Sequence, residues 1–392
     1  MVSSEAVVGL PGYEVTGIEE SEGFVRIRAR LAGSSVCPHC ESSELRLKER
    51  KVREVRHESL GSRRTKLCLE ACKWRCRGCA KTFWQRFPGL LPRRRATEPF
   101  RRSVAERHWD GISRARLSQR EKIGSATVER WFLEHLKRLA SERKHASCPR
   151  VLGIDEHFFT RRRGYATTFC DLARKRVFDV VLGRSEASLE GYLSHLRGKE
   201  RVQVVCIDLS PSYRALVKKH FPNARIVADR FHVIRLVNQR FLESLKLLDP
   251  LGYRNRGLIS LMRRHQSRLR EDQVQRLGLY LEERLALKEI YRFKQQLVEL
   301  LSFKSRNKSQ CYPLVIRLLE CIRTLKECGL PPLVSLGETL ESWAEEIVTM
   351  WRFTKNNAIT EGFHNKMEAL SRAAYGFRNF ENYRLRVRVM CS

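Results

Sequence analysis

Three acidic residues in well-separated contexts are the side chains of this sequence best suited to chemistry. Asp155 lies in the run VLGIDEHFF, Asp208 in VQVVCIDLSPSY and Glu361 in NNAITEGFHNKMEALSR. The first two interrupt or close apolar, β-branched runs, so we expect them on or just after buried strands, and we expect Glu361 on a helix. Carboxylates that converge from separate elements can hold divalent metal ions, which activate an attacking oxygen and stabilise a departing one. The three residues therefore indicate an enzyme that breaks or joins phosphodiesters.

Two Cys-x-x-Cys pairs near the start of the chain predict a zinc site: Cys37 with Cys40, and Cys76 with Cys79. Each pair holds two sulfurs close together in one turn, so the pairs can supply the four thiolates of a tetrahedral zinc ion. The 35 residues between the pairs exceed the ~15–20 of compact zinc ribbons, and we expect a hairpin or linker to fill the gap. Buried, reduced structural cysteines are the alternative interpretation, and substitute ligands lie nearby: Cys68, Cys72 and His39.

The charge of the chain indicates a polyanionic partner. Among 392 residues, 76 Lys and Arg outnumber 44 Asp and Glu, which gives a net charge of +32. From Gly61 to Arg120 the ratio is 17 to four. Such an excess favours nucleic acid as a partner, because it opposes the compact state through self-repulsion. Membrane binding is the competing explanation, but no apolar run approaches ~20 residues and no signal peptide opens the sequence. We expect an intracellular protein.

A basic connector joins the cysteine-containing segment to a helical one. Arg93, Arg94 and Arg95 follow Pro92, and such a run most simply forms an exposed connector. Because it lies between two segments that we expect to bind DNA, we predict that it contacts phosphate.

Residues 100–139 have the periodicity and turn residues of a helix-turn-helix. Three helices are expected, the third of which begins after a tight turn at Gly124 with Ser125 as its cap. This arrangement places Thr127 and Arg130 near the start of a candidate recognition helix that would read DNA. A purely structural three-helix bundle is the alternative interpretation.

From residue 150 the sequence becomes rich in strands. VLGIDEHFF, YATTFCDL and RVFDVVLG predict three successive antiparallel strands, and alternating helices and strands follow, with VQVVCID as the fourth strand and ARIVA as the fifth. This order is that of a ribonuclease H-like α/β fold. Its first and fourth strands would be adjacent, which would place Asp155 beside Asp208.

The segment 231–351 is almost wholly helical in pattern. We interpret it as an insertion in the catalytic fold, because a separate helical domain would give Glu361 no structural reason to reach the two aspartates. The sequence thus predicts a multidomain α+β protein with four parts: an N-terminal β-hairpin and zinc ribbon (1–92), a helix-turn-helix region (93–147), a ribonuclease H-like catalytic domain (148–230 and 352–392) and a long all-helical insertion (231–351).

Long motifs make the chain similar to a known family. CPHC with CRGCAKTF, GIDE, CIDLSPSYRALVKKHFPNARIVADRFHV and TEGFHNKMEALSRAAYGFRNFENYRLRV span most of the sequence. They resemble bacterial insertion-sequence transposases of the ISL-three family, which carry a DDE catalytic triad. The chain departs from that family shortly before the glutamate, where Ser-Asn-Gly is common and this sequence has Asn356, Asn357 and Ala358. His364 likewise stands where the family often has Asn, and neither change removes a carboxylate.

The resemblance implies a DNA transposase with its triad on Asp155, Asp208 and Glu361. The zinc ribbon and helix-turn-helix would recognise terminal inverted repeats, and the catalytic domain would cleave the strand and transfer the liberated 3′-OH to target DNA. Two Mg²⁺ or Mn²⁺ ions suit an all-carboxylate site. The implied partners are double-stranded DNA, as transposon ends and as target, and further copies of the chain, in a homodimer or higher oligomer. The protein would be cytoplasmic, and associated with the nucleoid when bound to DNA.

Several alternatives stay open at the level of sequence. Glu368 lies on the same helical face as Glu361 and could replace it, whereas Glu156 should face the opposite side of its strand. Asp229 and His232, just beyond the fifth strand, are either a helix cap with a packed histidine or a DNA contact. The functional alternatives are a catalytically silent, sequence-specific DNA-binding regulator derived from a transposase, and a ribonuclease H-like nuclease or resolvase.

Overall fold

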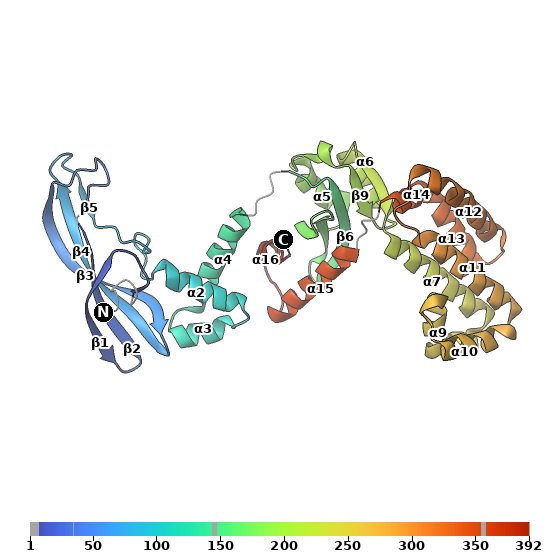
Figure 1. The fold of residues 1–392 in the computed structure, drawn as a ribbon, viewed down its shortest axis with the longest axis horizontal. Coiled ribbons are helices and arrows are strands. Elements are labelled where there is room, and N and C mark those ends of the chain that lie inside the picture. The colour runs from blue at the N-terminus through green and yellow to red at the C-terminus, as the bar shows by residue number, and fades with distance from the viewer. Residues whose placement is uncertain (1–7, 34, 143–146, 354–357, 392) are drawn as a thin grey trace. The chain divides into compact units, whose positions relative to one another are not determined.

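The chain folds into two compact units, Met1–Leu139 and Ala140–Ser392, and each is described by itself (Figure 1). The computed structural model describes the following residues, apart from the side chains of 358 and 359: 8–33, 35–142, 147–353 and 358–391. None of the helices in these ranges is both long enough and apolar enough to span a membrane.

The first unit contains a five-stranded sheet in the order β1-β2-β4-β3, with β5 paired to β4. Its strands are β1 (Tyr13–Ser21), β2 (Phe24–Leu31), β3 (Leu45–Leu60), β4 (Arg63–Cys76) and β5 (Thr82–Trp84). β1 and β2 form the hairpin that alternation in this region predicts. The long hairpin of β3 and β4 connects the two Cys-x-x-Cys pairs, which confirms that a hairpin fills the wide gap between them.

The connector that follows this sheet is attached to β3 and is not a free hinge. Arg56 N donates to Arg95 O at 2.9 Å, and Thr97 N donates to Arg56 O at 2.9 Å. The buried His57 ring contacts the Thr97 hydroxyl through Nδ1, also at 2.9 Å. Because these contacts continue the backbone pairing of β3, the sheet and the helices after it are fixed to each other within the first unit.

Three helices follow, as predicted: α2 (Glu98–Trp109), α3 (Arg114–Glu121) and α4 (Ser125–Glu142). They surround a small apolar core of their own: Ala96, Phe100, Val104, Leu117, Val128 and Trp131. The guanidinium of Arg56, on β3, donates to Glu121 O at 2.6 Å and to Lys122 O at 3.0 Å. These bonds satisfy carbonyl groups that the end of α3 would otherwise leave without partners.

The second unit contains a five-stranded sheet in the order β10-β9-β6-β7-β8. Its strands are β6 (Val151–Thr160), β7 (Gly164–Asp171), β8 (Arg176–Leu182), β9 (Val204–Ile207) and β10 (Arg225–Ala228). β6, β7 and β8 are antiparallel neighbours, whereas β9 and β10 run parallel to β6. The predicted adjacency of the first and fourth strands is therefore confirmed.

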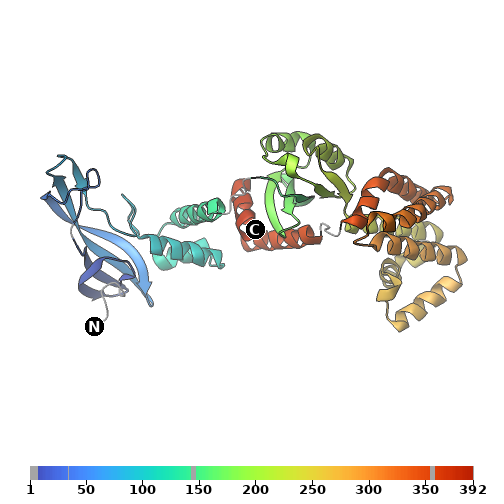
Figure 2. The same cartoon turned by 45° about the horizontal axis from the view of Figure 1, so that its top comes forward.

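Helices cover both faces of this sheet: α5 (Glu186–Ser194), α6 (Pro211–His220), α15 (Ala358–Ala373) and α16 (Phe380–Met390). Thr167 and Thr168 are neighbours on β7 and point to opposite faces. The Thr167 hydroxyl contacts Tyr213 of α6 at 3.1 Å, and the Thr168 hydroxyl contacts His364 of α15 at 3.2 Å. The C-terminal helices therefore lie on the face of the sheet opposite to α6, where Figure 2 shows them in red beside the green strands.

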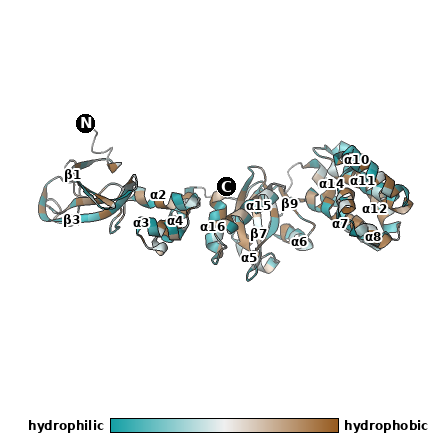
Figure 3. Cartoon of the chain, turned by 90° about the horizontal axis from the view of Figure 1, so that it is seen from below, coloured by the Kyte–Doolittle hydropathy of each residue, from teal (hydrophilic) through white to brown (hydrophobic). Residues whose placement is uncertain are grey.

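The chain between β10 and α15 contains helices only, within the residues that the structure describes: α7 (Arg230–Leu248), α8 (Pro250–Arg254), α9 (Arg256–Arg263), the short 3₁₀ helix Gln266–Arg268, α10 (Glu271–Glu282), α11 (Leu285–Ser302), α12 (Lys308–Glu327), α13 (Pro331–Ser342) and α14 (Ala344–Arg352). A further 3₁₀ turn, Lys199–Arg201, precedes β9. Hydrophilic and hydrophobic residues alternate around the helices (Figure 3). Helices α11 to α14 share one apolar core with the sheet, whereas α9 and α10 pack with parts of α7 and α11 in a separate cluster. The helical segment is thus joined to the sheet through a continuous core.

Arg230 fastens the start of α7 to this helical segment. Its side chain is 5% exposed. It donates to the carbonyls of Leu301 at 3.1 Å, Phe303 at 2.8 Å and Met350 at 3.1 Å. One buried guanidinium therefore satisfies three carbonyl groups from the ends of two other helices.

We expect Arg230→Met to lower the free energy of unfolding by about 2–4 kcal/mol, because it leaves buried carbonyls without donors. Arg235→Met is the matched control, since Arg235 is exposed on the same helix. Urea unfolding followed by circular dichroism measures both variants. Equal decreases for the two would contradict the role assigned to Arg230.

Candidate zinc centre and active site

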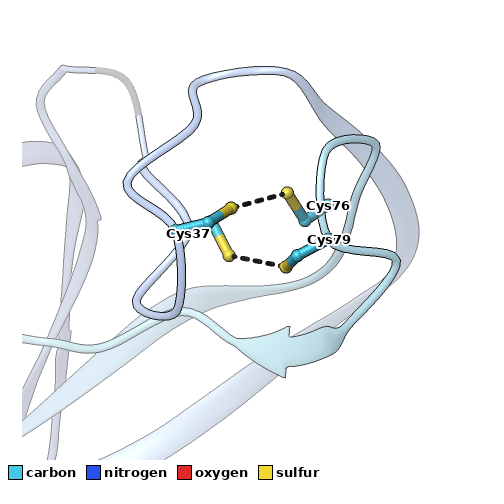
Figure 4. Close-up of side chains that lie close together, drawn as sticks. Cys37, Cys76 and Cys79 are labelled. Atoms are coloured by element: carbon cyan, nitrogen blue, oxygen red, sulfur yellow. Dashed lines mark hydrogen bonds between the residues drawn. The ribbon is translucent and has the colours of Figure 1, made fainter.

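The four predicted cysteines converge at one end of the first sheet. The sulfurs of Cys37, Cys40, Cys76 and Cys79 all lie within 4.8 Å of one another. Cys37 Sγ is 3.6 Å from Cys79 Sγ, and Cys40 Sγ is 3.5 Å from Cys76 Sγ. Figure 4 shows the sulfurs of the two turns pointing toward a common centre. Ligands about 2.3 Å from a tetrahedral zinc ion would be separated by about 3.8 Å, so the group fits zinc.

The substitute ligands are not members of this group. Cys68 and Cys72 lie within β4, and burial raises the pKa of both thiols. Within the cluster, a backbone hydrogen bond from Cys79 lowers the pKa of Cys76 to about 6, whereas at Cys40 a backbone hydrogen bond from Ser42 is outweighed by hydrogen bonds with the neighbouring thiols, which raise the pKa of Cys40. Within the part of the chain that the structure describes, the four cysteines are the sole cluster of three or more ligand side chains close enough to hold an ion.

Asp155 and Asp208 lie side by side in the second unit. The parallel register of β6 and β9 sets Asp155 opposite Asp208, two residues beyond the last paired positions. The parallel register of β9 and β10 sets Asp208 opposite Asp229, and Asp229 N donates to Ile207 O at 2.7 Å. The three carboxylates thus follow one line across three parallel strands, and we call them the aspartate row.

Burial makes negative charge unfavourable in the aspartate row. Asp155 is 8% exposed and Asp229 is 1% exposed. Burial raises the pKa of Asp155 to about 6; the charges of Asp208 and Asp229 act in the same direction, and His232 acts against them. Burial also raises the pKa of Asp208, whose Oδ1 is buried and accepts no hydrogen bond from the described residues. A divalent cation with oxygen ligands would offset this unfavourable burial of the carboxylates.

Asp229, His232 and Glu156 also have the structural contacts that the sequence suggested. Asp229 caps α7 by accepting from Phe231 N at 3.4 Å, and His232 Nε2 lies 3.6 Å from Asp229 Oδ2. Glu156 pairs with Arg184 at 3.1 Å.

Glu361 is exposed in the first turn of α15. The residue of α15 that faces the aspartate row is His364, whose Nδ1 is 3.9 Å from Asp155 Oδ2. Since residues three or four apart share one flank of a helix, Glu361 and Glu368 lie one turn before and one turn after His364 on that flank. Glu368 is 3.4 Å from Arg372. The structure thus brings the two aspartates together, and neither glutamate forms a hydrogen bond with them among the described residues.

The predicted DNA-binding residues differ in their surroundings. Arg93 and Arg95 are exposed, whereas Arg94 is half-buried, with Nη2 3.7 Å from the Glu134 carboxylate of α4. In the first turns of α4, Arg130 is exposed and Thr127 is half-buried. Arg101 bonds the same Glu134 carboxylate, so the basic run contains two open cations and one that lies beside a shared acidic side chain.

Asp229 and His364 belong to this site, although the sequence did not predict either as a metal-binding residue. Asp229 is expected from the sequence as a helix cap or a DNA contact, although it follows ARIVA as Asp208 follows VQVVCI, so the strand-end rule applies to it equally. His364 stands where the family often has Asn. It follows Glu361 by three residues, so the two side chains lie on the same flank of α15. Asn356 and Asn357, the other departure, lie outside the described residues.

Comparison with known families identifies the family to which this chain belongs. The sequence profile of the ISL3 (ISL-three) family of DDE transposases matches residues 152–387, and that of the zinc-finger of transposases of IS204, IS1001, IS1096 and IS1165 matches residues 34–79. The first match contains Asp155, Asp208 and Glu361, and the second contains all four cysteines. The chain belongs to the ISL3 transposase family, as its motifs predicted.

A similar protein is the transposase for insertion sequence element IS1001 of Bordetella parapertussis. It is 23% identical over 401 residues, which cover 98% of this chain and 96% of the relative. Together, the zinc-finger match and the four-cysteine cluster support a structural zinc ion in the first unit.

We expect the purified, reduced protein to carry about one zinc ion per chain, and Cys76→Ser to release it, because each thiolate is one of four ligands. Cys72→Ser is the matched control on the same strand and should retain zinc. Metal analysis after gel filtration, with circular dichroism of residues 1–139, measures the effect. Release of zinc from Cys72→Ser with retention in Cys76→Ser would contradict the ligand assignment.

Proposed function

We propose that this protein is a DNA transposase that binds the terminal inverted repeats of an insertion sequence, cleaves a strand at each end and joins the liberated 3′-OH to target DNA. The observation that carries the proposal is the pairing of the buried Asp155 with Asp208, whose Oδ1 is buried, on adjacent parallel strands within the segment that matches the transposase family. The unpaired Oδ1 of Asp208 is an oxygen that a cation in the active complex would take up.

We infer that the second unit has a ribonuclease H-like catalytic core. The strand order supports this inference. β6, β7 and β8 are antiparallel neighbours, and β9 and β10 lie parallel to β6 on its other side. The parallel arrangement aligns the ends of β9 and β10 beside Asp155. The helical segment between β10 and α15 would then be an insertion that shares the core of this fold.

Asp155, Asp208 and Glu361 would hold two Mg²⁺ or Mn²⁺ ions. When bound, such ions lower the pKa of the attacking water or 3′-OH and stabilise the departing oxygen. The chain itself orients the Asp155 carboxylate from two sides: Glu156 N donates to Oδ1 at 2.8 Å, and His364 Nδ1 lies beside Oδ2. Restricting the rotation of this group prepares it to bind metal without further reorganisation.

The first unit would bind the DNA ends. In this proposal α3 and α4 form a helix-turn-helix in which Thr127 and Arg130 meet base edges, and Arg93 and Arg95 contact phosphates. The exposure of both connector arginines and of Arg130 supports this assignment. Two DNA ends require at least two active sites, so the working complex would be a homodimer or a higher oligomer.

Asp155→Asn, Asp208→Asn and Glu361→Gln should each reduce strand cleavage by at least ~10³-fold, because each removes a charge that the metal ions need and keeps the side-chain size. Binding of end DNA should change little. The assay is cleavage of end-containing DNA in Mg²⁺ or Mn²⁺, and chelator should abolish the wild-type reaction.

Glu368→Gln is the matched control on the same flank of α15 and should retain most activity. A dead Glu368→Gln beside an active Glu361→Gln would move the third member of the triad to Glu368. Wild-type protein that binds the ends and never cleaves them would support a catalytically silent DNA-binding regulator.

Within the basic connector, we expect Arg93→Ala with Arg95→Ala to weaken binding to end DNA and to random DNA alike. The slope of log affinity against log salt should fall by about one for each phosphate that the protein no longer neutralises. Arg94→Ala should reduce that slope less, since Arg94 is half-buried and lies 3.7 Å from the Glu134 carboxylate, which Arg101 also contacts. Fluorescence anisotropy across a salt series measures all three substitutions. A reduced slope confined to Arg94→Ala would contradict the assignment.

A further inference from the structure

We propose that Tyr383, His157, Thr168 and His364 form a hydrogen-bonded chain that positions α15 against Asp155 and thereby sets the metal affinity of the active site. The inference rests on the proposed function and assigns these four side chains as positioning residues for it. They come from α16, β6, β7 and α15, so the chain connects both C-terminal helices to the two central strands that carry or flank Asp155.

The contacts are continuous from the C-terminal helix to the aspartate row. Tyr383 Oη is 2.8 Å from His157 Nε2, and His157 Nδ1 is 2.9 Å from Thr168 Oγ1. Thr168 Oγ1 is in turn 3.2 Å from His364 Nε2, and His364 Nδ1 is 3.9 Å from Asp155 Oδ2. Thr168 is also the cross-strand partner of Asp155, so both side chains lie on one face of the sheet.

The direction of the hydrogen bonds follows from the two groups at the ends of the series, the Tyr383 hydroxyl and the Asp155 carboxylate. A neutral imidazole has one donor and one acceptor nitrogen, so the two nitrogens of each ring must take opposite roles in these contacts. Tyr383 stays protonated, because burial raises its pKa, and its hydroxyl donates to His157. His157 then donates to Thr168, Thr168 donates to His364, and the remaining N–H of His364 faces the Asp155 carboxylate. The reverse order would aim a lone pair at that carboxylate.

These four hydrogen-bonded side chains are a costly way to fill the core if packing is their sole role. Tyr383 is 1% exposed and Thr168 is fully buried, and the ring of Tyr383 lies among Phe159, Phe377 and Phe380. A phenylalanine at 383 would fill the same space without burying a hydroxyl, and buried polar groups reduce stability unless every one is paired. Hydrogen bonds that run unbroken from Tyr383 to His364, with His364 Nδ1 3.9 Å from the Asp155 carboxylate, indicate a role in the site.

Anchoring His364 also fixes the rotation of α15 about its axis. Glu361 precedes His364 by three residues and lies on the same flank of the helix. A helix that rotated or slid would move this carboxylate away from the aspartate row. The chain therefore holds the helix that carries the third proposed ligand in register with the strands that carry the other two.

The test compares Thr168→Val, which keeps the shape and removes the hydroxyl, with Thr168→Ser, which keeps the hydroxyl. Full-length protein is assayed for cleavage of end DNA over a range of Mn²⁺ concentrations, with end binding and melting temperature measured in parallel. Thr168→Val should raise the Mn²⁺ concentration for half-maximal cleavage by about 10–100-fold. Thr168→Ser should keep the Mn²⁺ concentration for half-maximal cleavage within about threefold of the wild-type value.

Tyr383→Phe tests the member of the hydrogen-bonded series that is farthest from Asp155. Tyr375→Phe is its control, since Tyr375 is 97% exposed. Tyr383→Phe should raise the Mn²⁺ requirement at least ~3-fold while end binding is retained, and Tyr375→Phe should behave as wild type. His364→Asn should keep more activity than His364→Ala, because an amide can still contact Thr168.

A Mn²⁺ requirement for Thr168→Val equal to that of Thr168→Ser would overturn the inference, even if both variants were less stable. This result is distinguishable from failure of the proposed function. In that case wild-type protein would itself cleave no end DNA at any Mn²⁺ concentration.

Discussion

The constraint on which the rest of the second unit depends is the register of three parallel strands that sets one aspartate within β6 beside two that directly follow β9 and β10. Backbone pairing of β6, β9 and β10 sets Asp155, Asp208 and Asp229 in one row, where like charges repel at short range in a poorly solvated environment. The apolar core shared by the sheet and helices α11 to α14 holds the strands in this register against that repulsion. The unfavourable charge arrangement is thus imposed by the fold, as is common at sites that bind cations.

The surrounding elements offset only part of the electrostatic free energy that holding the three carboxylates close together costs. The N-terminus of α7 directly follows Asp229, where the helix dipole and the capped backbone N–H favour negative charge. His232 and His364 lie next to the carboxylates. The buried Oδ1 of Asp208 keeps no partner among the described residues. Incomplete compensation is what a site needs if metal ions and DNA phosphates are to complete it during catalysis.

Much of this arrangement was predictable from the sequence, because it depends on local patterns. The strand order, the position of Asp208 after the fourth strand and the hairpin between the cysteine pairs all follow from alternation, spacing and turn residues. The contacts that could not be predicted depend on tertiary packing. Pairing of Arg94 with Glu134 joins residues 40 positions apart, and the face that α15 presents to β6 depends on Thr168 and Tyr383, which no pattern around Glu361 encodes.

The central claim is that the carboxylates of β6 and β9 form a metal site that DNA completes. Anomalous diffraction at the manganese edge, from crystals of the full chain with uncleaved end DNA and Mn²⁺, tests it most directly. We predict anomalous peaks between the carboxylates of Asp155 and Asp208, on the side from which α15 contributes Glu361. Manganese bound elsewhere, with no peak beside Asp155 or Asp208 in a complex that cleaves DNA when warmed, would contradict the account.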